Sequence, residues 1–301
     1  MQFGGPGIVS KFFPPLTQPE VDQIVANAVA GGINWFDTAE MYGWGHAERT
    51  LATGLVNNGV TSDQAVIATK WSPIGRRAAS IERTIDARVT ALDPFPIGIH
   101  QIHMGHGSVS SLRSQIRAMA RLAEHGTIGA VGVSNFSAHQ MERAHAVLAE
   151  HGLGLATNQV RVNLLHRKLE TDGLADTARR LGVTLIAYSP LAGGILTGKF
   201  HADRSLMAKM PRTRRIYGFT NRRLDRTAPL IDGLRDIADG QAASVSQVAL
   251  AWLTTNYGDN VVAIPGASKP HHAMEAADAM RLRLSEDEVS RINQLSALVG
   301  G

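Results

Sequence analysis

Short apolar runs alternate with segments of helical period along the whole chain. The runs lie at residues 33–39, 65–71, 98–104, 128–136, 155–163, 184–191 and 261–267. Between the runs, segments such as 19–32 carry apolar residues at helical spacing and end in glycines. Parallel strands covered on both faces are nearly continuous apolar runs, and each needs a long crossover to the next strand. The pattern therefore predicts an α/β fold with a parallel sheet covered by helices.

The length of the chain favours one closed form of that sheet. Strand and helix units repeat roughly every 25–35 residues over 301 residues, which suits a (β/α)8 TIM barrel better than an open sheet. We therefore expect one barrel domain over residues 1–301. Polar residues follow the apolar part of nearly every run, and in a barrel these positions meet at the carboxyl-terminal mouth, where active sites are built.

Composition excludes several kinds of chemistry. The chain has no Cys, so disulfides, thiolate catalysis and cysteine-ligated metals are excluded, and no other sequence pattern predicts a metal site. The net charge of +4 is spread over the chain except in one basic stretch, so we expect no nucleic-acid partner. No apolar run approaches the ~18 residues of a membrane span, and the opening residues do not resemble a signal peptide. We expect a cytoplasmic protein without a membrane partner.

The basic stretch is part of the longest connection between two predicted strands. Residues 199–226 are dense in Lys and Arg, and a loop of this length is usually functional or disordered. Its charges are either a solvated face or, at the mouth of a barrel, partners for phosphates. Residues 193–199 fit the first part of a P-loop, but Phe200 stands where a P-loop has Ser or Thr, so ATP hydrolysis is not predicted.

The strongest local motif is DTAEMYG at residues 37–43, followed by Glu48. It resembles the signature of the aldo-keto reductases, and ordered blocks at Lys70, His103, 132–136, 158–167, 187–199 and 264–268 resemble further parts of that family. The resemblance is closest to the branch with the potassium-channel β subunits and related bacterial reductases. It implies an NADP(H)-dependent oxidoreductase that reduces a small aldehyde or ketone to an alcohol, or catalyses the reverse reaction.

The resemblance also assigns roles to four residues. Carbonyl reduction develops negative charge on oxygen, which calls for a proton donor and preorganised polar groups. Tyr42 corresponds to the general acid, and a neighbouring ammonium from Lys70 favours its phenolate form. Asp37 would keep Lys70 protonated, and His103 would orient the carbonyl.

Further matches imply how a dinucleotide is held without a Rossmann fold. Ser134, Asn135 and Gln159 correspond to partners of the nicotinamide amide, and Tyr188 to the aromatic residue that stacks on its ring. The remaining predicted contacts are with the pyrophosphate, the 2′-phosphate and the adenine, and they involve Ser189, Leu191, Gly193, Lys199, Gly266, Ser268, Lys269, His272 and Glu275.

Some positions depart from the family pattern. Arg161-Val162 stands where many members have Glu-Tyr, and Ser268-Lys269 lies where an Arg is usual. The blocks also start late, because the first barrel strand would end near residues 1–5. We therefore expect a first strand that is truncated or that begins upstream.

Two other functions stay open on the sequence. A regulatory subunit would bind NADP and dock to a partner with little turnover, and a barrel isomerase or aldolase would use Lys70 as a Schiff base. Retention of all four catalytic matches favours the reductase. Substrate identity and oligomeric state are not predicted.

Overall fold

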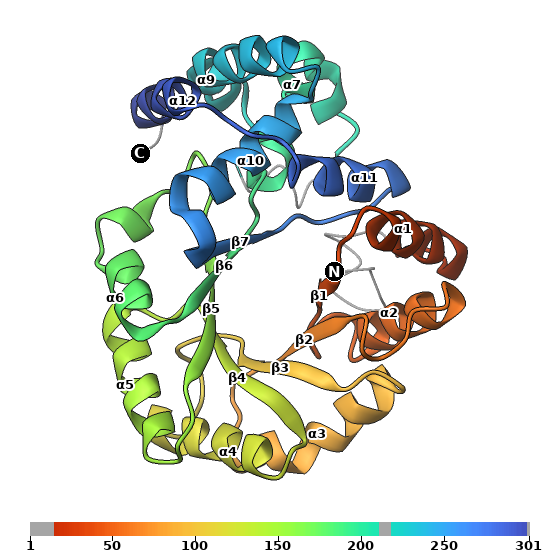
Figure 1. Ribbon diagram of the computed structural model, residues 1–301, viewed down its shortest axis with the longest axis vertical. Helices are drawn as coiled ribbons and strands as arrows, with labels where there is room; N and C mark the ends of the chain where they lie inside the picture. Colours follow the sequence, from red (N-terminus) through yellow and green to blue (C-terminus); the bar gives the residue numbers. More distant parts are fainter. Residues whose placement is uncertain (1–14, 211–217, 300–301) are drawn as a thin grey trace.

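Seven parallel strands form a nearly closed ring in the computed structural model, which describes residues 15–210 and 218–299 (Figure 1). Each strand pairs with the next one along the chain, so the order in the sheet is the order in the sequence. The strands are β1 (Trp35–Asp37), β2 (Val66–Trp71), β3 (Ile97–Ile102), β4 (Ile128–Ser134), β5 (Leu155–Arg161), β6 (Thr184–Tyr188) and β7 (Val261–Ile264). All seven predicted strands are present, and the barrel prediction is confirmed.

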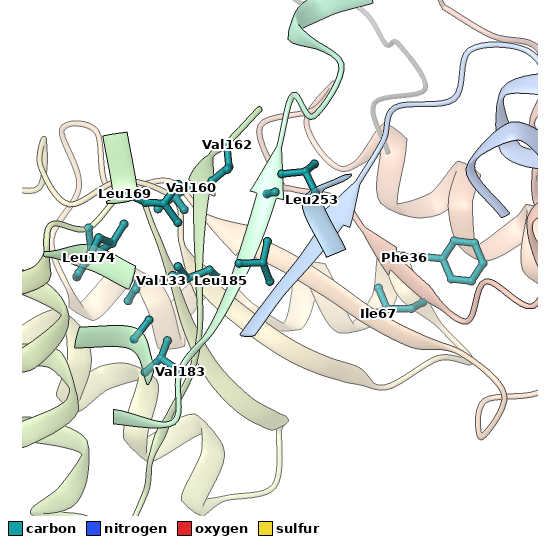
Figure 2. Packing of buried hydrophobic residues seen from close by; sticks show 14 of the residues in the cluster. Phe36, Ile67, Val133, Val160, Val162, Leu169, Leu174, Val183, Leu185 and Leu253 are labelled. Carbon is teal, nitrogen blue, oxygen red and sulfur yellow. The ribbon is translucent and has the colours of Figure 1, made fainter. Parts of the chain in front are cut away.

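Alternation along each strand separates a polar interior from an apolar outer layer. On β5, Gln159 points into the barrel and reaches Asp37 of β1, whereas the neighbouring Val160 packs in the core between sheet and helices. Figure 2 shows Val160 with other outward-facing residues, among them Phe36, the neighbour of Asp37. The period of two therefore points every second side chain into the barrel, and those at the carboxyl ends of the strands line its mouth.

Helices cover the outer face of this sheet. They are α1 (Gln18–Ala30), α2 (His46–Asn57), α3 (Ala79–Leu92), α4 (Leu112–Glu124), α5 (Ala138–Ala149), α6 (Leu174–Leu181), α7 (Lys199–Ala202), α9 (Asn221–Gly240), α10 (Val245–Tyr257), α11 (Pro270–Ala279) and α12 (Glu286–Val299). Short 3-10 helices lie at Lys168–Glu170, Ala192–Thr197, Arg204–Met207 and Gly258–Asn260. Helices α9 and α12 form an additional layer outside α10 (Figure 1).

The helical layer brings α1 beside α11, although the two are far apart in the sequence (Figure 1). Asn27 Nδ2 donates to the carbonyl oxygen of Pro270 at 3.1 Å. A Cβ on Gly31 would lie only 2.2 Å from the Ala277 Cβ, so the close approach of these helices requires glycine there.

Two expectations from the sequence concern the basic stretch 199–226 and the start of the chain. The basic stretch 199–226 was expected to be one long loop, and this was wrong in part because α7, the 3-10 helix Arg204–Met207 and the start of α9 occupy much of it. The expected truncation of the first barrel strand falls on residues that lie outside the described part of the chain. Within the described residues, the sheet ends at β1 and β7.

Candidate active site

A buried ion pair lies where β1 and β2 end. The ammonium of Lys70, which has no exposed surface, pairs with the Asp37 carboxylate and also donates to the Thr38 carbonyl oxygen at 2.8 Å. Asp37 Oδ2 accepts two further hydrogen bonds, from Gln159 Nε2 at 2.8 Å and from Gln101 Nε2 at 3.1 Å. A buried charge pair is tolerated only when its remaining hydrogen-bonding groups are satisfied, and the two glutamines meet that need for the carboxylate.

Tyr42 lies on the turn between β1 and α2, and that turn is firmly anchored. Glu40 Oε1 accepts from the backbone N–H of Ser72 at 2.7 Å, and its Oε2 accepts from Arg88 at 2.9 Å. Arg88 also forms an ion pair of 2.8 Å with the fully buried Glu48, whose other oxygen accepts from Thr69 Oγ1 at 2.6 Å. These contacts tie both ends of the turn to β2 and α3 and fix the position of the phenol.

Three predicted catalytic side chains surround one point at the barrel mouth. The rings of Tyr42 and His103 meet edge to face, with centroids 5.9 Å apart and planes at 81°. Lys70 Nζ lies 5.6 Å from the centroid of the Tyr42 ring. The phenol therefore has an ammonium and an imidazole as neighbours, and the ammonium is the one paired with Asp37.

His103 is a neutral imidazole at neutral pH in this environment. Burial and, to a smaller extent, the Lys70 charge lower its pKa to about 4, and the Asp37 charge partly opposes them. Its backbone N–H donates to the Trp71 carbonyl oxygen at 3.0 Å, which holds the start of the loop after β3 against β2. A neutral imidazole can donate a hydrogen bond to a carbonyl without competing as the acid.

A second hydrogen-bonded group lies at the ends of β4 and β6. Tyr188 Oη donates to Asn135 Oδ1 at 3.0 Å, and Asn135 Nδ2 donates to Ser134 Oγ at 3.0 Å. Ser134 in turn donates to the carbonyl oxygen of Gln159 at 2.9 Å. Burial raises the pKa of Tyr188, so its phenol stays protonated. The structure thus joins the four residues predicted to contact the nicotinamide.

The loop after β6 has an unusual backbone. Ser189, Ala192, Gly193, Gly194 and Gly198 all have positive φ angles, between 49° and 108°. Asn163 Nδ2 holds the loop by donating to the Ser189 carbonyl oxygen at 2.9 Å. Successive residues of this kind turn backbone N–H groups outward and form concave anion sites. Ser189, Leu191, Gly193 and Lys199 belong to this loop and its continuation.

Positive charge gathers between that loop and the start of α11. Burial, together with the charges of His271, Lys199 and Lys269, lowers the pKa of His272 to about 4. The rings of His271 and His272 lie with their centroids 4.4 Å apart. Ser268 N–H donates to His272 Nδ1 at 3.3 Å, on the first turn of α11. A helix N-terminus with adjacent lysines suits a phosphate group. Of the other predicted contacts, Gly266 is exposed beyond β7 and Glu275 is half-buried on α11.

Some residues that hold the Asp37–Lys70 pair and the Tyr42 turn in place were not predicted from the sequence. Gln101 was not predicted, although it lies two residues before His103 and therefore on the same face of the chain near the strand end. The roles of Glu40 and Arg88 were also missed, because only the fold brings the turn before α2 against α3.

A buried Asp–Lys pair therefore lies beside a tyrosine and a histidine at the carboxyl end of a parallel barrel, next to a loop with successive positive φ angles. This is the arrangement that the sequence predicts for a barrel oxidoreductase. Residues 1–297 match the model of the aldo/keto reductase family. The chain is 38% identical over 248 residues to a protein of Mycobacterium tuberculosis named as an uncharacterized oxidoreductase, which covers 81% of this chain and 72% of that protein. The chain belongs to the aldo/keto reductase family and is an oxidoreductase.

Other relatives agree with this assignment. A chloroplastic pyridoxal reductase of Arabidopsis thaliana is 31% identical over 281 residues, covering 89% of this chain and 74% of that one. The solved glycerol dehydrogenase of Gluconobacter oxydans superposes with a TM-score of 0.78 at 26% identity, covering 93% and 86% of the two chains. An aldo-keto reductase of Klebsiella pneumoniae solved with NADPH shares the fold, with a TM-score of 0.72 at 24% identity, over 98% and 88% of the chains.

None of the helices in residues 15–210 and 218–299 is long and apolar enough to cross a membrane. The cytoplasmic location stays a prediction.

Proposed function

We propose that the protein reduces the carbonyl group of a small aldehyde or ketone with NADPH, or oxidises the corresponding alcohol with NADP, and that Tyr42 is the general acid. The observation that carries this proposal is the position of Tyr42 between the His103 ring and the buried Lys70 ammonium. No other described feature gives a phenol such neighbours at the barrel mouth.

Each residue has a definite part in the proton transfer. The Tyr42 hydroxyl gives its proton to the carbonyl oxygen as negative charge develops there, and the nearby Lys70 charge stabilises the resulting phenolate. Asp37 keeps Lys70 protonated in a site that would otherwise favour the neutral amine. His103, neutral because burial lowers its pKa to about 4, donates a hydrogen bond that orients the carbonyl.

The cofactor residues fit NADP(H), which supplies the hydride when bound. Ser134, Asn135 and Gln159 offer polar groups for the carboxamide beside the Tyr188 ring. The positive-φ loop from Ser189 suits the pyrophosphate. At the other end, Lys199 of α7, and Lys269 and His272 at the start of α11, suit the 2′-phosphate that distinguishes NADP from NAD.

The geometry argues against a Schiff-base aldolase or isomerase. A Schiff base needs a neutral, accessible amine, whereas Lys70 is fully buried and its ammonium is engaged by Asp37 and Thr38. A regulatory subunit would bind the cofactor at the same site and would differ from a reductase only in its low turnover. Kinetic measurements therefore distinguish the two functions.

Replacement of Tyr42 by Phe tests the proposal. We expect kcat for NADPH oxidation with an aldehyde to fall about 10²- to 10⁴-fold, because the acid is lost. NADPH affinity should be retained, and NADPH should bind more tightly than NADH. Tyr257→Phe is the matched control, since it removes a phenol that donates to Glu170 far from the mouth.

Three results would count against the reductase. Wild-type turnover in Tyr42→Phe would remove Tyr42 from the mechanism. Tight NADPH binding by the wild type with no turnover of any aldehyde or ketone would favour the regulatory subunit. Trapping of the protein by borohydride with a carbonyl compound, without cofactor, would favour the Schiff-base enzyme.

A further inference from the structure

All three guanidinium nitrogens of Arg76, on the loop after β2, donate hydrogen bonds. Nη1 pairs with the Glu40 carboxylate and also donates to the Ser72 carbonyl oxygen at 3.3 Å. Nε donates to Ser80 Oγ at 3.1 Å, and Nη2 donates to Thr84 Oγ1 at 2.9 Å. A planar guanidinium with every nitrogen engaged is fixed in one orientation, although 27% of the side chain is exposed. Arg76 is therefore held rigidly, unlike an ordinary surface arginine.

Through Glu40, this guanidinium reaches the turn that carries the proposed acid. Glu40 lies two residues before Tyr42, and its backbone carbonyl oxygen accepts from the Gly45 N–H at 3.2 Å. The Glu40 side chain is 9% exposed, and its carboxylate pairs with the guanidinium groups of Arg76 and Arg88. Such charge-assisted hydrogen bonds are about twice as strong as neutral ones. Arg76 therefore fixes the turn of Tyr42 to the loop after β2.

The same arginine is bound to the loop after β3, which begins with His103. The Arg76 carbonyl oxygen accepts from the Val109 N–H at 3.1 Å and from Ser108 Oγ at 2.8 Å. At the other end of that segment, the His103 N–H donates to the carbonyl oxygen of Trp71, whose ring centroid lies 5.2 Å from Arg76 Cζ. The segment from His103 to Val109 is therefore held at both ends by the short stretch of chain from Trp71 to Arg76.

We propose that Arg76 is a positioning residue that holds the turn of Tyr42 and the loop of His103 in one arrangement. The proposal rests on the proposed function, because it takes the roles of Tyr42 and His103 from there. Arg76 acts through Glu40 on the phenol and through its own backbone on the imidazole. An acid and a carbonyl-orienting group must stay aligned with the same oxygen atom, and a misplacement of about 1 Å can cost about 100-fold in rate. Loss of the Arg76 side chain should therefore lower the rate of the reaction and leave the cofactor site intact.

Kinetics of Arg76→Gln test this role, because the change removes the charged fork from Glu40. With NADPH and para-nitrobenzaldehyde, we expect kcat to fall about 10- to 100-fold, whereas the dissociation constant of NADPH, measured by fluorescence, stays the same. Arg76→Lys restores a charge beside Glu40 and should recover part of the loss. Arg77→Gln is the matched control and should leave kcat unchanged, because Arg77 is exposed and its side chain has no hydrogen bond or ion pair within residues 15–210 and 218–299.

A double-variant cycle with Glu40→Ala separates positioning from a general loss of stability. If Arg76 acts through Glu40, the double variant should lose much less kcat than the product of the two single losses, because the first change already removes the contact. Losses that multiply overturn the proposal, since the two residues then act independently. An unchanged kcat in Arg76→Gln, or a fall in kcat/KM that comes only from weaker NADPH binding, also overturns it.

Hydrogen exchange tests the same role without turnover. In Arg76→Gln, the backbone amides of the turn at residues 40–45 and the amide of Val109 should exchange about 10-fold faster than in the wild type, because a hydrogen bond between charged groups is lost and the two segments open more readily. Faster exchange at both places, in a protein that reduces no aldehyde or ketone, supports the positioning role and refutes the proposed function. Unchanged exchange at either place overturns the positioning role, even when the wild type is active.

Discussion

The ion pair between Asp37 and Lys70 makes an asymmetric prediction about stability. Both side chains are buried, with exposures of 5% and 0%. If Asp37 is replaced by Ala, the Thr38 carbonyl oxygen is the one hydrogen-bond partner that the Lys70 ammonium keeps within residues 15–210 and 218–299. If Lys70 is replaced by Met, the Asp37 carboxylate keeps both glutamine amides, Gln101 and Gln159, as hydrogen-bond donors.

The partners that remain in each variant determine how much stability it loses. Removing one partner of a buried ion pair costs about 3–5 kcal/mol because an uncompensated charge is left behind, and we expect Asp37→Ala to show this loss. The cost of Lys70→Met should be smaller by about one hydrogen bond to a charged group, about 1.5–3 kcal/mol. The double variant, which leaves no buried charge, should be more stable than Asp37→Ala alone. For a chain of this size, the loss in Asp37→Ala corresponds to a decrease in Tm of about 6–10 °C.

Urea unfolding followed by circular dichroism measures these differences without using activity. Glu82→Ala is the control, because it breaks a partly exposed pair with Arg121 and should cost about 1 kcal/mol or less. The reasoning is refuted if Asp37→Ala unfolds at the same urea concentration as Glu82→Ala. It is also refuted if the double variant is less stable than Asp37→Ala by the full cost of Lys70→Met, since the two sites would then be independent.

Two further predictions concern the barrel interior and acid stability. A Cβ on Gly132 would lie 2.8 Å from the Gln101 Cγ, so Gly132→Ala should cost about 1–3 kcal/mol and lower kcat; Gly154→Ala, where nothing lies within 4 Å, is the control in the same unfolding and rate assays. Burial lowers the pKa of His100 to about 3, with smaller effects from nearby arginines, and neither ring nitrogen has a partner in the described residues. The unfolded chain therefore binds more protons below pH ~6.5, so stability falls as the pH drops from about 6.5 to about 3. His100→Leu should shift acid unfolding to lower pH, and an unchanged midpoint by circular dichroism would contradict this.

Local periodicity explains why the fold and the mouth residues could be predicted. The apolar runs identify all seven strands, because strands covered by helices on their outer face are nearly continuous in apolar residues. Parallel strands then bring Asp37, Lys70 and His103 to one end of the barrel. The anchoring of the Tyr42 turn by Arg88 could not be predicted in the same way, because it depends on how α3 is rotated against the sheet.

The hydrogen bond between Gln159 and Asp37 connects two parts of the site that sequence reasoning treated as separate. The two residues are 122 positions apart, so their contact depends on the sheet curving into a barrel. Gln159 Nε2 is engaged by the carboxylate that also pairs with Lys70, which leaves its Oε1 to accept from the carboxamide proposed to lie above it. The same carboxylate thus holds both the ammonium next to the proposed acid and the amide next to the proposed nicotinamide position. If the proposed roles hold, one buried group would position the groups beside both the proton donor and the cofactor ring, which would keep the two in a fixed relation, as hydride transfer coupled to protonation requires.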